Sequence, residues 1–112
     1  MKGRTVFLGV AAGVLAAALG AETWKNVTII DSMCVDKARG NPDRHTRKCA
    51  LACEDGGYGI LTADGKFLRF DASGNEKAVA ALEATTKTDA LRATVEGTRS
   101  GDEIHVESVK ID

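Results

Sequence analysis

The sequence predicts a small domain of the α+β class, mainly β with two short helices. Short runs of alternating apolar and polar residues, separated by turn-forming residues, predict five strands. Two segments with helix-start signals interrupt these runs. The chain has 112 residues, 44% apolar and 28% charged, with a single proline, which is typical of one small globular domain. This composition excludes a multidomain enzyme, a collagen, a coiled coil and a typical disordered chain.

The first 20 residues have the pattern of a secretory signal peptide. Lys2 and Arg4 form a short basic start, and residues 6–19 form an uncharged run rich in Ala, Val and Leu. Ala18 and Gly20 place small residues at the −3 and −1 positions of a cleavage after Gly20. The uncharged run is shorter than the roughly 20 residues that a membrane span requires. We therefore expect residues 21–112 to form a single periplasmic or secreted domain with no stable membrane anchor after cleavage.

The mature chain is small and nearly balanced in charge. Without the first 20 residues it keeps 13 basic and 16 acidic side chains, a net charge of −3. This net charge lacks the excess of basic residues that is typical of nucleic-acid-binding domains, so no nucleic-acid partner is expected. A chain of this length buries only about 60% of its unfolded surface, so cross-links would help it to stay folded.

The first half of the mature chain predicts three strands and one helix. The β-forming run Trp24–Asp31 predicts the first strand. Asn41-Pro42-Asp43 has the signals of a helix start, and we expect this helix to run to about Glu54. Two further strands, 58–63 and 66–71, flank Asp64-Gly65, a pair suited to a two-residue type I′ hairpin turn.

The second half predicts a helix followed by two strands. Ser73 and Glu76 have capping-box spacing, so the helix is expected to begin near Ser73. Alternation over residues 91–96 predicts a strand with one buried face. In the last strand, the apolar positions change parity between Val106 and Val109, which predicts a bulge near Ser108.

This order of elements predicts the topology. Apart from the helix at 41–54, it is β-β-β-α-β-β, the order of an OB-fold, a five-stranded Greek-key barrel whose helix lies between strands three and four. We therefore predict an OB-fold-like barrel with a cysteine-bearing helix inserted between strands 1 and 2.

The inserted segment carries a candidate metal site made of Cys34, His45, Cys49 and Cys53. His45, Cys49 and Cys53 are spaced four apart and would share one face of a helix. Along an unbroken helix, however, His45 and Cys53 lie roughly 12 Å apart, too far to bind one ion. A tetrahedral site with all four ligands would require the helix to break.

A disulfide is the simpler interpretation of the same cysteines. Export places Cys34, Cys49 and Cys53 in an oxidising compartment. Cys49 and Cys53 would bridge each other poorly within a helix, so Cys34 is expected to pair with Cys53 or with Cys49. Either bridge closes a loop of about 15 to 20 residues, worth about 3 kcal/mol in the chain-entropy model. The remaining thiol would be free to pair between chains or to react.

Several segments together carry a family resemblance. They are Asp31-Ser32-Met33-Cys34, the later Cys49 and Cys53 with three residues between them, the strand 58–61, and the ending from Val95 to Val109. These motifs resemble those of a group of small exported bacterial proteins regarded as OB-fold-like. A looser similarity holds to periplasmic OB-fold stress-tolerance proteins. The resemblance implies the fold more firmly than an activity. In members of the group a His often follows the first Cys by four residues, where this chain has Ala38.

The sequence offers no constellation typical of an enzyme. It has no Ser-His-Asp pattern, no phosphate-binding glycine loop and no His pair at metal spacing. We therefore expect a non-enzymatic, exported binding or stress-related module, stabilised by a disulfide, without a cofactor and with a small ligand or a protein as partner. The alternative is a periplasmic protein that binds zinc or copper, or performs thiol redox chemistry, through Cys34, His45, Cys49 and Cys53.

Overall fold

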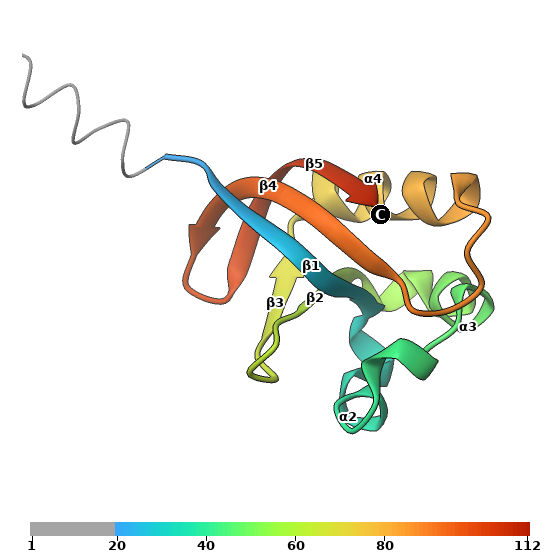
Figure 1. The fold of residues 1–112 in the computed structure, drawn as a ribbon. Coiled ribbons are helices and arrows are strands. Elements are labelled where there is room, and N and C mark those ends of the chain that lie inside the picture. The colour runs from blue at the N-terminus through green and yellow to red at the C-terminus, as the bar shows by residue number, and fades with distance from the viewer. Residues whose placement is uncertain (1–19) are drawn as a thin grey trace, which may run out of the picture.

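The computed structural model describes residues 20–112 and shows five strands that close into a barrel (Figure 1). Around the barrel they follow the order β1-β2-β3-β5-β4. Their bounds are β1 Glu22–Asp31, β2 Tyr58–Leu61, β3 Phe67–Phe70, β4 Arg92–Ser100 and β5 Glu103–Ile111. One helix, α4 (Ala72–Ala84), connects β3 to β4. The predicted OB-fold-like barrel is confirmed.

The predicted signal peptide lies outside the described residues, apart from Gly20. Among residues 20–112, no helix is both long enough and apolar enough to cross a membrane.

A parallel strand pair closes the barrel. β3 pairs with β5 in parallel, with Arg69 opposite Glu103 and Phe70 opposite Ile104, whereas the other pairs of neighbouring strands are antiparallel. The inward-facing residues of β4 and β5 include Ala93, Val95 and Ile104, all fully buried as their alternation predicts. Helix α4 contributes its own buried residues to the same core: Gly74, Ala78 and Leu82.

Helix α4 begins earlier than its sequence predicts. The N-cap is Asp71, whose carboxylate accepts a hydrogen bond from the backbone N–H of Gly74 at 2.9 Å. The same carboxylate oxygen accepts from the N–H of Val106 on β5 at 3.2 Å. Ser73, the predicted cap, therefore lies inside the helix. Asp71 takes the capping position because its carboxylate accepts hydrogen bonds from the N–H groups of both the first turn of α4 and strand β5.

The hairpin turn also differs from the prediction. Gly65 has a positive φ of 85°, but Asp64 does not, so the turn is not type I′. Its backbone hydrogen bonds run from Thr62 N–H to Lys66 C=O and from Gly65 N–H to Thr62 C=O, both at 2.9 Å. The loop is therefore longer than two residues and the flanking strands are shorter than predicted. The Thr62 hydroxyl contributes by bonding to Asp64 and by accepting from Lys66 N–H at 3.1 Å.

The bulge predicted near Ser108 is confirmed. Glu96 pairs with Ser108 and Gly97 with Val106, which leaves Glu107 as the extra residue on β5. Because a strand alternates its side chains between two faces, this extra residue allows Val109 to pack against the same core as Val106.

The predicted single helix over 41–54 is wrong. The segment between β1 and β2 consists of short pieces that lie together where β1 ends (Figure 1). They are the 3-10 turn η1 Ser32–Cys34, α2 Val35–Ala38, η2 Pro42–Arg44, α3 Arg47–Ala52 and η3 Glu54–Gly56. His45 and Thr46 are extended and separate η2 from α3. The break has one local and one long-range cause: Thr46 caps α3 by accepting from Cys49 N–H at 3.1 Å, and Asp43 is bound to Arg92 of β4 at 2.7 Å.

This inserted segment, residues 32–57, covers the outside of the barrel. A second, smaller core forms between it and the strands, from Ile30, Val35, Ala38 and Leu61. As a result both faces of β1 are buried from Val27 to Asp31. The burial extends to a polar residue, Asp31, which begins the candidate site.

Candidate functional site

Asp31 is a fully buried carboxylate with one paired and one unpaired oxygen. Its side chain is 0% exposed, and Oδ1 lies 2.7 Å from Nε2 of His45. Within residues 20–112, Oδ2 has no hydrogen-bond partner. Burying an oxygen of this kind without a partner is unfavourable, and native structures rarely contain one. The unpaired Oδ2 is therefore a candidate ligand atom.

Two thiols lie beside this carboxylate. One oxygen of Asp31 and the sulfurs of Cys34 and Cys53 all lie within 4.8 Å of one another. The ligands of a tetrahedral zinc ion with sulfur and oxygen donors stand roughly 3.5–4 Å apart, from bond lengths of about 2.0–2.3 Å. The 4.8 Å limit on the distances within these three groups, called here the Asp31 cluster, is compatible with that spacing.

Ser32 brings the two cysteine-bearing turns together. Its hydroxyl donates to the carbonyl of Gly56 at 2.6 Å, and its backbone N–H donates to the carbonyl of Gly57 at 3.0 Å. These bonds join η1, which ends at Cys34, to η3, which follows Cys53. In the Asp31-Ser32-Met33-Cys34 motif, Asp31 and Cys34 thus provide two groups of the cluster, and Ser32 holds the segment that follows the third, Cys53.

The break before α3 places His45 next to Asp31. Because His45 is extended, it leaves the axis of α3 and reaches the end of β1. His45 therefore orients the carboxylate through Oδ1 and leaves Oδ2 unpaired. The close group includes neither His45 nor Cys49, so of the predicted metal set the structure brings together only Cys34 and Cys53. Cys49 lies on the exposed side of α3.

Helix α3 is held firmly against the rest of the molecule. The guanidinium of Arg47 donates to the carbonyls of Leu82 at 2.5 Å and Glu83 at 3.2 Å, near the C-terminus of α4. The hydroxyl of Tyr58, a buried residue of β2, donates to the carbonyl of Ala50 at 2.7 Å. These contacts hold the first residue and the middle of α3, the helix that Cys53 follows.

The Cys34 thiol stays protonated at neutral pH. Burial, followed by a hydrogen bond to the Asp31 side chain, the charge of Asp31 and then Cys53, raises the pKa of Cys34 to about 11. A reactive redox thiol needs the opposite shift, because the thiolate is the nucleophile. The raised pKa shows instead that this site disfavours further negative charge, and a bound cation would relieve that repulsion.

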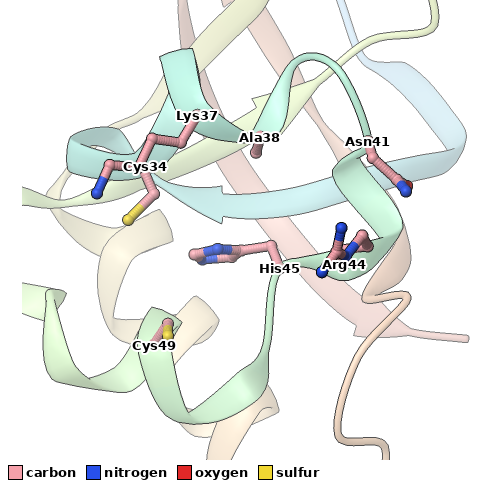
Figure 2. A pocket seen from close by; sticks show the side chains of 7 residues that line it. All are labelled: Cys34, Lys37, Ala38, Asn41, Arg44, His45 and Cys49. Carbon is pink, nitrogen blue, oxygen red and sulfur yellow. The ribbon is translucent and has the colours of Figure 1, made fainter.

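A cavity of about 380 Å³ is lined by Cys34, one member of the Asp31 cluster (Figure 2). Cys34, His45 and Cys49 lie around the same space in this view, between the α2 and α3 segments. Cys34 belongs both to this cavity and to the Asp31 cluster. The cavity is lined by Cys34, Lys37, Ala38, Asn41, Arg44, His45 and Cys49.

All three cysteines are free thiols in the structure. Of the two pairings expected from the sequence, Cys34 with Cys53 has its sulfurs within the 4.8 Å group, whereas Cys49 lies outside it. Sequence reasoning missed Asp31, because an acidic residue at the end of a strand is typical of a loop. The only available signal was its place in the motif three residues before Cys34.

The fold and the Asp31 cluster define a class of protein: a small OB-fold-like barrel that carries a buried carboxylate beside two thiols. Comparison with known protein families, with curated proteins and with solved structures finds no match.

Proposed function

We propose that this protein is an exported, non-enzymatic module that binds a zinc or copper ion through Asp31, Cys34 and Cys53. The observation that carries the proposal is the fully buried, unpaired Oδ2 of Asp31 beside two thiols. The signal-peptide pattern of residues 1–20 supports export.

The donor set suits these metals. Thiolates favour zinc and copper(I), and zinc also accepts a carboxylate oxygen. Metal binding would deprotonate Cys34 and Cys53 and would give Asp31 Oδ2 the partner that it lacks. His45 is a positioning residue in this proposal, because it binds the other oxygen of the carboxylate and so orients it.

A second function is favoured by the proximity of the Cys34 and Cys53 thiols. A disulfide between them would cross-link the two ends of the inserted segment and stabilise the module by about 3 kcal/mol in the chain-entropy model. This disulfide and a bound metal exclude each other, because they use the same sulfurs. The metal is favoured because a disulfide would leave Asp31 Oδ2 unpaired.

The test uses the mature protein purified under reducing conditions. We expect it to bind one equivalent of zinc, which would protect Cys34 and Cys53 from alkylation and leave Cys49 reactive. Free zinc at 100 times its dissociation constant should raise the free energy of unfolding by about 2.7 kcal/mol. Cys34→Ser and Cys53→Ser should lose this effect, whereas Cys49→Ser is the matched control that should keep it.

One result would contradict the metal proposal. Protein that contains a single alkylatable thiol, Cys49, and gains no stability from zinc after reduction would contradict the metal proposal and support the disulfide.

A further inference from the structure

The cavity beside the Asp31 cluster has the size of a small-ligand site. Its volume of about 380 Å³ falls within the range of roughly 300–1,000 Å³ found for small-molecule pockets. Cys34 is the member of the Asp31 cluster that lines the cavity, so its thiol is where the cavity meets the proposed metal site.

The cavity wall carries positive charge that the described residues do not neutralise. Lys37 and Arg44 both line it, and neither makes a side-chain hydrogen bond or an ion pair within residues 20–112. The acidic residues adjacent to them in sequence, Asp36 and Asp43, are bound to Arg39 at 2.6 Å and to Arg92 at 2.7 Å. No acidic side chain is among the residues that line the cavity. The cavity is thus suited to an anion.

The metal proposed above would have one coordination position left. Asp31, Cys34 and Cys53 supply three ligand atoms, and zinc binds four. A carboxylate oxygen is an ordinary fourth ligand for zinc, and the guanidinium of an arginine can bind a carboxylate through two parallel hydrogen bonds.

We infer that this cavity binds a small carboxylate anion between the metal ion and the side chains of Lys37 and Arg44. The inference rests on the proposed metal function and deepens it, because it names the ligand class that the module takes. Asn41, on the same wall, offers an amide to the polar end of the ligand.

Cobalt(II) provides the readout. It adopts the tetrahedral geometry of zinc, and its visible absorption bands change with the ligands bound to it. The reduced mature protein is loaded with cobalt and titrated with succinate, with sodium chloride of equal ionic strength as the salt control. We expect succinate, but not chloride, to shift the bands to a saturating value.

Two double variants distinguish succinate binding in the cavity from a nonspecific effect of positive charge. Replacing Lys37 and Arg44 by Gln should weaken succinate binding about tenfold or more, since it removes charge-assisted hydrogen bonds. The affinity for cobalt should remain, because neither residue belongs to the Asp31 cluster. The matched control replaces Lys25 and Lys110, exposed lysines of β1 and β5, by Gln and should leave succinate binding unchanged.

The outcomes distinguish the two proposals. A protein that gives no cobalt bands contradicts the metal function, and the anion site with it. Cobalt bands that do not respond to succinate, or that respond equally in both double variants, contradict the anion site alone. A Cys49→Ser variant whose cobalt bands change before succinate is added would show that Cys49 is the fourth ligand, which also overturns the anion site.

Discussion

Asp31 is the residue on which the proposed site depends. It ends β1 and is fully buried, with one oxygen bonded to His45 and the other without a hydrogen-bond partner among the described residues. A residue retained only for packing would be better replaced by an uncharged one, because desolvating a carboxylate is unfavourable. The two roles, packing and metal binding, predict different effects of neutralising Asp31.

The substitution Asp31→Asn tests this difference. We expect the metal-free variant to be no less stable than the wild type, because it removes a buried charge and keeps an oxygen that can accept from His45. The stabilisation by zinc should be lost, because the carboxylate ligand is gone. Urea unfolding with and without zinc measures both effects.

Asp55→Asn is the matched control, since Asp55 is an exposed acid of the same inserted segment. Its response to zinc should equal that of the wild type. An Asp31→Asn protein that is stabilised by zinc as strongly as this control would remove Asp31 from the metal site.

Helix α3 positions Cys53, and its N-cap is Thr46. The hydroxyl of Thr46 accepts from the N–H of Cys49 at 3.1 Å and helps to end the extended stretch that carries His45. We expect Thr46→Ala to lower the free energy of unfolding by about 1 kcal/mol and to weaken zinc binding. Thr46→Ser, which keeps the hydroxyl, should retain most of both. Equal stability and zinc affinity in the two variants would show that the cap is unimportant.

Strand β2 depends on a close approach of backbones at Gly59. A Cβ at this position would lie beside the backbone carbonyl oxygen of Leu68 and the ring of Phe67, closer than atoms can approach. We expect Gly59→Ala to lower the free energy of unfolding by roughly 2 kcal/mol or more, because the backbone of β3 has to move.

Gly40→Ala serves as the control for Gly59→Ala. A Cβ at Gly40 meets no atom within 4 Å, so its effect should stay within about 0.5 kcal/mol. Chemical denaturation of both variants gives the comparison, and similar midpoints would contradict the predicted contact.

The molecule as a whole joins a closed barrel to a second small core outside it. The inserted segment is attached to the barrel by the Asp43–Arg92 ion pair and by the Tyr58 hydroxyl of β2 bonded to Ala50, and to the end of α4 by Arg47. The free energy of unfolding of the protein should therefore depend on the ionisation of groups at this junction. Two of them, the partly buried Cys34 and the buried Tyr58, titrate at alkaline pH.

The raised pKa values of these two groups predict that the protein loses stability at alkaline pH. Folding raises the pKa of Cys34 from 9.0 to about 11, and it raises the pKa of Tyr58 from 10.0 to about 12, through burial first and the Glu54 carboxylate second. Between the unfolded and folded values the native state binds more protons than the unfolded state. The stabilising contribution is therefore complete below pH 9 and is lost as the pH rises toward 12.

Urea unfolding of the reduced, metal-free protein at several pH values measures this loss. In Cys34→Ser the decline should begin about one pH unit higher, at the ordinary pKa of Tyr58. A wild-type stability that is constant from pH 8 to about pH 11.5 would show that neither group is desolvated in solution.

The sequence by itself determined most of the barrel. Alternation in 91–96, the parity change near Ser108 and the order of elements all follow from local periodicity, and the structure confirms them. Apolar residues recur every two positions in a strand and about every 3.6 positions in a helix, because they lie on the buried face. This pattern can be read from residues that are close together in the sequence.

Only the tertiary structure decided the candidate site. The break at His45 depends on Arg92, which is 49 positions from its partner Asp43, and the meeting of Cys34 with Cys53 depends on Ser32 bonding to Gly56, 24 positions away. Single hydrogen bonds between distant residues leave no periodic pattern in the sequence. For the same reason the sequence indicated three cysteines and a histidine as metal ligands, whereas the fold brought a carboxylate to two of those thiols and placed the histidine behind it.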